Sequence, residues 1–435
     1  MDTQYDAIVI GAGMAGLTAA RKIAETGKKV AVLSRGLGTT NMSTGVIDLL
    51  GYLQNELVIN PEENISKLVR TSPNHPYAKI GNGNAKKTLE VLKISIQDFL
   101  EITNMTYAGK TSQNVVLSNY FGTFRPSCIV PISMLHGNLL EFKDSKLMTV
   151  GVPCYSEFNA KFFSRSLQYV VNSFFKQTII KEIVSQDIML PSLGKNKEIT
   201  SIEIAEALDN EELFSGFLKQ LQKFVNKTDA YTVAFPAILG YKNWIQNHQR
   251  LEEELGVQVF ECLSLPPSVA GQRLQQILEN AVNDIGVEIH RGIQVLSAHV
   301  ENNECKTLET VADIYRRTFT ADVFVLATGS FIAEGLYFDG IKFYEPIFDL
   351  PVRSGNKTNH FAGKRLESGK HNIGFTGIIT DETLRPLDLD GKVLADNLFG
   401  AGSILAGYDY ISEKSGLGVA LTTGYVAGLN AISVL

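Results

Sequence analysis

Cysteine is scarce in this chain. Only four cysteines occur in 435 residues, namely Cys128, Cys154, Cys262 and Cys305. Because no two of them form a CxxC unit, the sequence excludes a zinc ribbon, a thioredoxin-type pair and an iron–sulfur cluster held by this chain alone. The seven histidines form no HxxxH or Cys/His cluster, so we also expect no metal site. Scattered thiols in a long chain are typical of a reducing cytoplasm.

An excess of positive charge and long apolar runs are lacking too. The 40 Lys and Arg residues against 46 Asp and Glu give a net charge of −6, so no basic surface is expected for a nucleic-acid backbone. No run of about 18 uncharged apolar residues occurs. The N-terminal residues have neither the basic region nor the apolar stretch of a signal peptide. We expect a cytoplasmic protein that reaches the inner face of the membrane only through partner subunits.

Glycine, by contrast, is plentiful, with 37 residues, and several of them form motifs. Residues 6–10 predict a strand, residues 14–24 have the apolar spacing of a helix, and residues 29–33 predict a second strand. Such a β–α–β unit places two parallel strands beside each other with a crossover helix.

The turn between the first strand and this helix reads GxGxxG, with glycine at positions 11, 13 and 16. In this context the motif predicts a dinucleotide-binding turn. Gly11 allows the tight turn, Gly13 lets a pyrophosphate approach the backbone, and Gly16 lets helix and strand pack closely. With Met14 and Ala15 they are predicted to bind a phosphate at the helix N-terminus.

The end of the second strand departs from the dinucleotide pattern. An Asp or Glu usually binds the ribose there, but this chain has Ser34 followed by Arg35. Three interpretations stay open. Ser34 binds the ribose of an adenosine, or Arg35 faces a phosphate as in NADP sites, or the ligand is a mononucleotide without an adenosine half.

More glycine turns follow in other parts of the chain. Three turns close to the ends of strands indicate a flavoprotein better than a nicotinamide dehydrogenase, which needs only the first turn. The C-terminal helix would direct its N-terminal dipole at the flavin pyrimidine, where charge builds up on reduction. The predicted cofactor-binding residues of these segments are Ser43, Thr44, Gly45, Ala327, Thr328, Gly329, Gly402, Ser403, Gly416, Leu417 and Gly418.

With these motifs the chain resembles the flavoproteins with two dinucleotide-binding folds, the relatives of succinate dehydrogenase and fumarate reductase. More closely, it resembles the B subunits of the anaerobic glycerol-3-phosphate dehydrogenases. The resemblance extends along nearly the whole chain, is loose over residues 85–225, and is carried by residues 42–50, 75–77, 265–274, 327–331, 345–347, 380–386 and 397–407.

The resemblance implies a soluble flavin subunit that works with a sister flavoprotein subunit and an iron–sulfur, membrane-anchoring subunit. The complex would oxidise glycerol 3-phosphate to dihydroxyacetone phosphate and pass electrons to quinone, then to fumarate or nitrate. The family is described with FMN for this subunit, which would agree with the missing acid at Ser34. The intact GxGxxG motif favours FAD, so the flavin is expected and both FAD and FMN stay open.

Candidate catalytic residues lie shortly before the last glycine turn. Oxidation of a secondary alcohol needs a base for the hydroxyl proton and a cation for the phosphate. Arg385 is suited to bidentate binding of phosphate or carboxylate. Asp381 is a candidate base, and Thr380 precedes it in the same segment. Each of these residues also has a plain structural interpretation, as a loop acid or an ion-paired arginine.

Two groups of other residues are expected to be structural. Arg273 should lie on the polar face of its helix, over residues 269–283. The histidines in Pro or Gly contexts, His75, His136 and His371, lack a catalytic motif around them.

The predicted fold class is α/β, with a Rossmann-like flavin-binding domain that is discontinuous in sequence and an inserted α+β domain. The flavin-binding domain is expected at residues 1–60, 265–345 and 390–435, and the inserted substrate or partner domain at 61–264 and 346–389. Two alternatives stay open for function: a stand-alone flavin oxidoreductase with another substrate, and an electron-relay or structural flavin subunit without substrate chemistry of its own.

Overall fold

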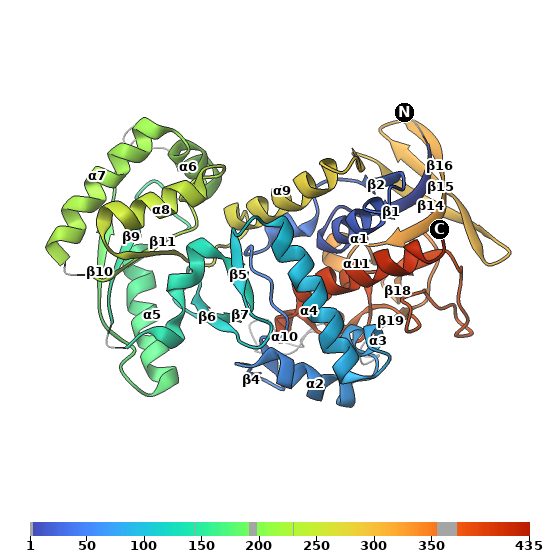
Figure 1. Ribbon diagram of the computed structural model, residues 1–435, viewed down its shortest axis with the longest axis horizontal. Coiled ribbons are helices and arrows are strands. Elements are labelled where there is room, and N and C mark those ends of the chain that lie inside the picture. The colour runs from blue at the N-terminus through green and yellow to red at the C-terminus, as the bar shows by residue number, and fades with distance from the viewer. Residues whose placement is uncertain (1–2, 144, 191–197, 229, 355–371) are drawn as a thin grey trace. The chain divides into compact units, whose positions relative to one another are not determined.

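The computed structural model describes residues 3–143, 145–190, 198–228, 230–354 and 372–435 (Figure 1). The chain divides into two compact units. The first consists of Met1–Thr40, Ile47–Ile102 and Gln275–Leu435, and the second of Asn41–Val46 and Thr103–Leu274. Each unit has a largely or wholly parallel sheet of its own.

The main sheet of the first unit has seven strands in the described part of the chain. Parallel pairing joins β13, β2, β1, β16 and β21, whereas β15 and β14 add an antiparallel extension. Buried apolar residues fill β1 and β2, as expected for strands covered on both faces. The strands are β13 (Glu288–Arg291), β2 (Val30–Ser34), β1 (Gln4–Ile10), β16 (Tyr315–Leu326), β15 (Glu304–Ala312), β14 (Gln294–Glu301) and β21 (Leu398–Gly400).

Strand β16 pairs with different neighbours along its length. Its first half pairs antiparallel with β15, and its second half lies between β1 and β21 in parallel pairing. Asn397, the residue before β21, connects this strand to β15 and β16. Its side-chain oxygen accepts from Cys305 N at 2.8 Å, and its side-chain nitrogen donates to Cys305 O and Asp322 O. The β14–β15 turn has positive φ at Asn302 and Asn303, which asparagine tolerates in tight hairpins.

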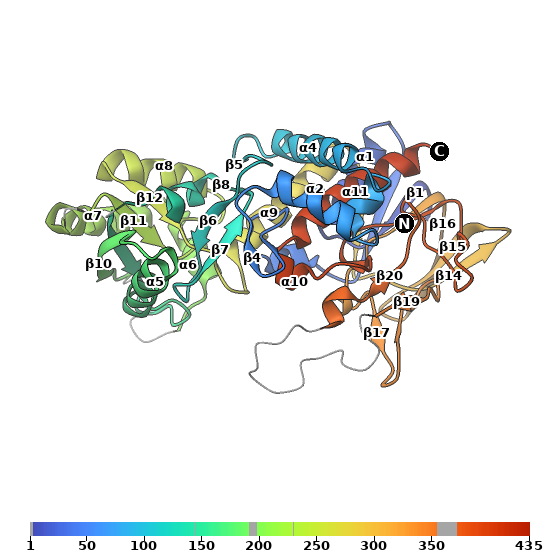
Figure 2. The ribbon, with the colours of Figure 1, turned by 90° about the horizontal axis from the view of Figure 1, so that it is seen from below.

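Helices α1 (Met14–Ala24) and α11 (Gly416–Ile432) pack against each other in the first unit. They approach closely because α11 has glycines on the contact face. A Cβ atom at Gly424 would lie 2.4 Å from Ala15 O, and one at Gly428 would lie 2.8 Å from Lys22 Cβ. Helix α4 (Ala85–Ile102) also lies beside α11, where Ser95 Oγ donates to Thr422 Oγ1 at 3.3 Å (Figures 1 and 2).

Shorter elements complete the first unit. They are β3 (Tyr52–Leu53), β4 (Glu56–Leu57), α2 (Pro61–Thr71), α3 (Pro76–Ile80), β17 (Tyr337–Phe338), β18 (Phe343–Tyr344), β19 (Val352–Arg353), β20 (Gly377–Ile378) and α10 (Tyr410–Glu413), with 3₁₀ turns η5 (Phe331–Ala333), η6 (Asn372–Phe375) and η7 (Gly402–Ile404). Helix α9 (Val269–Asn283) has the predicted bounds, and the division between the units falls inside it.

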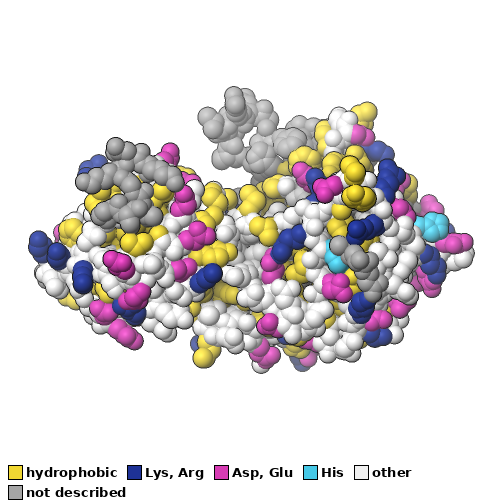
Figure 3. All heavy atoms as spheres, turned by 90° about the horizontal axis from the view of Figure 1, so that it is seen from above, with side chains coloured by type: hydrophobic (Ala, Val, Ile, Leu, Met, Phe, Trp, Pro, Cys, Tyr) yellow, Lys and Arg dark blue, Asp and Glu magenta, His cyan; other side chains and the backbone are white. Residues whose placement is uncertain are grey.

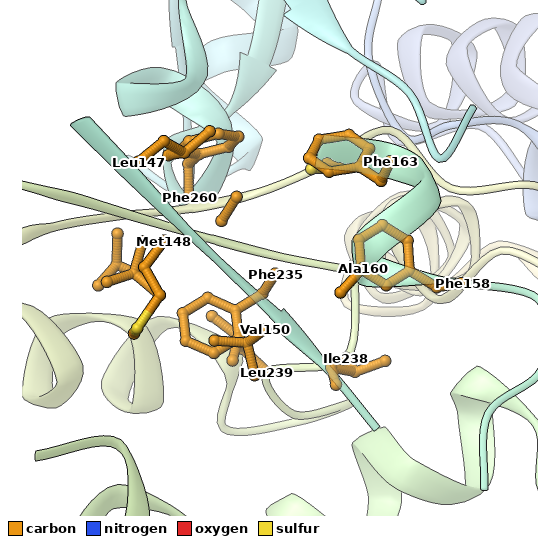
Figure 4. Close-up of a cluster of buried hydrophobic side chains, with 14 of the residues drawn as sticks. Leu147, Met148, Val150, Phe158, Ala160, Phe163, Phe235, Ile238, Leu239 and Phe260 are labelled. Atoms are coloured by element: carbon orange, nitrogen blue, oxygen red, sulfur yellow. The ribbon is translucent and has the colours of Figure 1, made fainter. Parts of the chain in front are cut away.

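The second unit is built on a wholly parallel sheet in the order β10, β9, β11, β12. Its core packs large apolar side chains from the strands, from helix α5 and from the segment after β11, including Met148, Phe163, Phe235 and Phe260 (Figure 4). The strands are β9 (Ser145–Gly151), β10 (Ile180–Asp187), β11 (Thr232–Phe235) and β12 (Gln258–Glu261), and the helices are α5 (Ala160–Phe175), α6 (Ser201–Leu208), α7 (Glu211–Thr228) and α8 (Trp244–Leu255).

Small antiparallel pairs precede this sheet in the chain. They are formed by β5 (Tyr107–Gly109) with β8 (Ile129–Pro131), and by β6 (Val115–Ser118) with β7 (Phe124–Ser127). The 3₁₀ turns of this part are η2 (Ile132–Gly137) and η3 (Leu139–Glu141), and η1 (Thr39–Met42) lies where the chain first passes between units.

The compact units differ in extent from the two predicted domains. Residues 61–102 group with the first unit, because α4 packs on α11 and α2 packs on α4. The described residues between 346 and 389 also group with it, since β20 pairs with β19 and Ile378 pairs with Leu405.

Charged side chains of both signs are interspersed over the face drawn in Figure 3, among the residues described there. None of the helices in the described ranges has the length and apolar character needed to cross a membrane. The described residues also contain no group of three or more His, Cys, Asp or Glu side chains that could hold a metal ion.

Candidate functional site

Three parallel strands of the first unit end side by side, each directly before a predicted glycine turn. The pairing register aligns Ile10 with Leu326, and Leu326 with Gly400. Because the carboxyl ends of parallel strands meet at one sheet edge, the turns that follow lie together there. We call residues 11–16, 327–330 and 401–403 the turn cluster.

Close contacts join the three turns. A Cβ at Gly11 would lie 2.2 Å from Ala327 O, so only glycine fits between the first two turns, and its φ of +116° requires glycine as well. A Cβ at Gly402 would lie 2.8 Å from Ala15 Cβ, which brings the third turn against α1. Ser403 Oγ accepts from Ser330 N at 3.1 Å. The structure thus brings these three glycine turns together at one edge of the sheet, and their role in cofactor binding stays a prediction.

The N-terminus of α1 provides amide donors at the turn cluster. The first bond within the helix runs from Leu17 N to Gly13 O, so the amides of the preceding residues have no partner inside the helix. Met14 N donates to Thr40 Oγ1 at 2.8 Å, which leaves the Ala15 and Gly16 amides directed at the N-terminal end. A Cβ at Gly13 would have only ordinary contacts, the nearest at 3.6 Å to Thr40 Oγ1.

Two buried polar atoms near these turns have no hydrogen-bond partner among the described residues. They are Thr328 Oγ1, in the second turn, and Gln275 Oε1. The amide nitrogen of Gln275 donates to Ala12 O at 2.8 Å, which fixes its side chain beside the first turn. Since buried polar atoms normally have partners, these two atoms are suited to bind polar groups of a ligand.

Ser34, the last residue of β2, and Arg35 after it both have partners within the chain. Ser34 Oγ donates to Gly36 O at 2.6 Å. Arg35 forms an ion pair with Glu334 and lies 3.5 Å from Tyr337 Oη. The Arg35 guanidinium, about half exposed, is therefore already partnered by a carboxylate, which also raises its pKa above the ordinary value.

The N-terminus of α11 has no side-chain cap. Ser415 precedes the helix without capping it, because its hydroxyl donates to Glu413 at 3.0 Å. Gly416 and Leu417 are partly exposed, whereas Gly418 is buried and its amide donates to Asp48 O at 3.2 Å. A Cβ at Gly418 would lie 2.5 Å from the same carbonyl oxygen, so packing alone requires this glycine.

Comparison with known proteins places the chain in a family. The sequence profile of the FAD binding domain family matches residues 6–419. The B subunit of the anaerobic glycerol-3-phosphate dehydrogenase of Pectobacterium atrosepticum is 30% identical over 426 residues, which cover 96% of each chain. The chain belongs to the FAD-binding family of these B subunits.

Other B subunits are similar over the same extent. The probable B subunit of Halobacterium salinarum is 28% identical over 439 residues, covering 100% of this chain and 99% of that protein. Among solved structures, the open conformation of a flavocytochrome c3 fumarate reductase is 10% identical, with a TM-score of 0.45, covering 100% of this chain and 79% of that chain.

The turn cluster fits the flavin of the B-subunit family. It offers backbone amides at a helix N-terminus, a glycine without close neighbours at its Cβ position, and the unpartnered buried Thr328 Oγ1, with Gln275 Oε1 as a second such atom beside it. Amides in this position suit a phosphate group, and the lone polar atoms suit the hydroxyl or ring groups of a nucleotide. The cofactor of this α/β oxidoreductase is therefore a flavin, and its family profile is that of FAD.

The predicted residues Ser43, Thr44 and Gly45 belong to the second unit. Gly45 has a φ of +76°, its carbonyl accepts from Tyr107 Oη at 2.7 Å, and a Cβ there would lie 2.8 Å from Ala270. Packing within the second unit therefore accounts for this glycine, and a role of the three residues in cofactor binding stays a prediction.

The predicted catalytic segment forms a tight local network. Asp381 accepts from Thr383 and from Arg385 N, and its Oδ2 lies 3.0 Å from Arg385 Nε. Arg385 also contacts Asp396 at 2.9 Å. Thr380 is buried. These contacts account for the positions of Asp381 and Arg385 without a ligand, so their catalytic roles stay predictions.

Several residues that form hydrogen bonds with the turn cluster were not predicted from the sequence. Gln275 was missed because it lies on a helix where a polar residue normally faces solvent, and Thr40 because loop threonines are common. Thr423 was missed inside α11, where its Oγ1 accepts from Gly402 N at 2.9 Å. His75, predicted to be structural, is buried and its Nε2 lies 3.1 Å from Glu413. His371 lies outside the described residues.

Proposed function

We propose that this chain is the flavin subunit of an anaerobic glycerol-3-phosphate dehydrogenase complex, which oxidises glycerol 3-phosphate to dihydroxyacetone phosphate. The observation that supports the proposal is the turn cluster: three distant segments meet at one edge of the sheet in a chain that belongs to the FAD-binding family of B subunits. Electrons would pass on to quinone, and then to fumarate or nitrate.

A bound flavin would supply the two-electron acceptor for this oxidation. Residues of this chain would bind and orient it: the amides of Ala15 and Gly16 bind phosphate oxygens, and Gly13 leaves room for them. Thr328 Oγ1 and Gln275 Oε1 would bind polar groups of the same ligand. The first amides of α11 would stabilise negative charge through the helix dipole.

Substrate handling would fall to the segment that follows β20. A secondary alcohol must lose its hydroxyl proton to a base, and Asp381 is the candidate. Arg385 Nε holds the Asp381 carboxylate at 3.0 Å, which keeps its oxygens in a fixed orientation. In this proposal Arg385 is a positioning residue as well as a candidate contact for the substrate.

Electron transfer away from the flavin requires partners. The four cysteines are far apart in the sequence, so this chain offers no CxxC unit for a cluster of its own. We propose that a sister flavoprotein and an iron–sulfur, membrane-anchoring subunit complete the complex, and that this cytoplasmic chain reaches the membrane's inner face through them.

The proposal is tested with the purified complex under anaerobic conditions. Adding glycerol 3-phosphate should bleach the visible absorption of the bound flavin, and glycerol at the same concentration should not. A complex that stays oxidised with glycerol 3-phosphate but is reduced by a different alcohol would contradict the proposal.

An electron-relay role without substrate chemistry is a second candidate, favoured by the ion pairs that occupy Arg385. The variant Arg385→Ala separates the two. If the segment handles substrate, turnover of the assembled complex should fall about a hundredfold or more, because the orientation of the base is lost. If this chain only relays electrons, turnover should stay unchanged. Thermal unfolding of the variant should shift little in either case, since partly exposed ion pairs contribute little to stability.

A further inference from the structure

A pocket in the first unit, lined by residues outside the turn cluster, combines two cations with an apolar wall. Lys79 of α3 and Arg353 of β19 line it together with the polar residues Asn74 and Thr380. Its apolar lining includes Pro76, Ile378 and Leu405. The pocket thus takes one cation from α3 and the other from β19.

The two cations in this pocket are not neutralised by the described chain. Neither Lys79 nor Arg353 forms an ion pair with a described residue, whereas four other arginines of the first unit do, namely Arg21, Arg35, Arg291 and Arg385. The described residues that line the pocket include no Asp or Glu. Two uncompensated positive charges at one concave site favour binding of an anion.

The buried residue Thr380 adds a hydroxyl donor. It is 4% exposed and lines the pocket, and its hydroxyl has no hydrogen bond to another described residue. Its Cγ2 methyl faces Gly400, at 3.6 Å from the place where a Cβ would lie there. A threonine oriented this way keeps its hydroxyl available to a ligand.

The fold fixes the position of Lys79 through the start of α3. Pro76 is the first residue of this helix, and His75 caps it, because His75 Nδ1 accepts from Tyr77 N at 3.0 Å. The proton of the neutral His75 ring is therefore on Nε2, which lies 3.1 Å from Glu413 Oε2. Tyr77 Oη donates to Leu49 O at 2.9 Å. These buried bonds anchor the helix that carries Lys79.

The position of Arg353 is fixed by strand pairing. Arg353 lies opposite Gly377 in the β19–β20 pair. A Cβ at Gly377 would lie 2.4 Å from Ala406 N, so β20 packs directly on the segment after η7, and Ala406 N donates to Ile378 O at 2.9 Å. The pocket is thus built from three segments held by backbone bonds.

We propose that this pocket binds a phosphate monoester, through Lys79 and Arg353 with Thr380 as a hydroxyl donor, and its apolar wall receives the carbon chain. Arginine suits the oxygens of a phosphate in bidentate geometry, and lysine adds a compact second charge. The identity of the ligand rests on the function proposed above: it is glycerol 3-phosphate, and Lys79 and Arg353 select it over glycerol.

Binding of inorganic phosphate to the isolated full-length chain tests the site directly. Phosphate should raise the unfolding temperature of the wild-type chain compared with chloride at equal ionic strength. The variants Lys79→Met and Arg353→Met should lose this response, and Lys79→Arg should keep it. Lys86→Met and Arg316→Met, at exposed positions outside the pocket, should respond as the wild type does. Equal responses in all six proteins, or none in the wild type, would overturn the proposal.

Reduction of the flavin in the assembled complex gives the second readout. The glycerol 3-phosphate concentration for half-maximal bleaching should rise about ten- to a hundredfold in Lys79→Met and Arg353→Met, the loss expected for one charged hydrogen bond. Unchanged half-saturation in both variants would overturn the assignment of the substrate while bleaching itself upholds the proposed function. A phosphate response without any bleaching by glycerol 3-phosphate would instead uphold the site and reject the function.

Discussion

At the scale of single residues, the largest departure from expectation is Arg273. The apolar spacing of residues 269–283 predicts it on a solvated face, yet it is 3% exposed and pairs with buried Glu261 at 2.7 Å. Its guanidinium also donates to Gly240 O and lies 4.9 Å from the centre of the Trp244 ring. Periodicity identifies a polar position, but only tertiary structure shows that a buried acid lies opposite it.

Burial of Glu261 would raise its pKa, but Arg273 and the bonds from Leu239 N and Ser133 Oγ lower it below the ordinary value. Because the pKa is lower in the folded chain than in the unfolded chain, this group stabilises the fold above its unfolded pKa. The contribution is lost as the pH falls through the folded pKa. Acid should therefore weaken the folded second unit.

The variant Arg273→Met should be strongly destabilised, because it leaves a buried carboxylate without its cation. We expect a loss of about 3–5 kcal/mol in the free energy of unfolding at neutral pH, measured by urea denaturation. The loss should shrink in acid, where Glu261 becomes protonated. Arg250→Met, which removes an exposed pair with Glu211, serves as the control and should leave the urea midpoint nearly unchanged. A similar midpoint for both variants would contradict this account of Glu261.

At the scale of elements, two glycines at the start of α1, Gly16 and Gly13, differ in how closely they are packed. A Cβ at Gly16 would lie 1.9 Å from Gly11 O, whereas one at Gly13 would meet nothing closer than 3.6 Å. The backbone at Gly13 is extended, with a φ of −89°, so alanine is tolerated there. The same motif thus contains one glycine that the fold needs, Gly16, and one that packing does not require, Gly13, which we propose is needed for the phosphate.

Alanine substitutions distinguish these two roles. Gly16→Ala should destabilise the flavin-free chain by about 1–3 kcal/mol, because the added methyl group overpacks the turn. Gly13→Ala should leave that stability nearly unchanged and weaken flavin binding about tenfold or more, since the methyl group blocks close approach of the phosphates. Denaturation of the flavin-free variants and flavin titration give the two values. Full flavin affinity in Gly13→Ala would place the phosphates elsewhere.

Several elements could be predicted from the sequence because their signals are local. The β1–α1–β2 unit and the bounds of α9 follow from apolar spacing and from the glycines of the first turn. Strand β16 is harder to predict as one element, because its first half is largely exposed whereas its second half is a continuous buried apolar run. It forms one strand in the structure, where β15 pairs with its first half and β1 pairs with its second half.

At the scale of the whole molecule, the first compact unit is assembled from three separate stretches of the chain. Glycine motifs mark the sheet edge in three distant segments. Nothing comparable marks α2 and α4, whose apolar faces predict burial without naming the partner helix. The phosphate pocket shows the same limit, since Lys79 and Arg353 are ordinary surface residues in sequence and share a site only through strand and helix placement.

The central claim is that three segments form one binding edge for a complete flavin dinucleotide, despite Ser34 in place of the usual acid. The most direct measurement is the mass of the flavin released when the purified chain is heat-denatured. The account predicts FAD, at about one molecule per chain, because the glycine turn and the N-terminus of α1 bind a pyrophosphate. Release of FMN, or a colourless chain that releases no flavin, would contradict it.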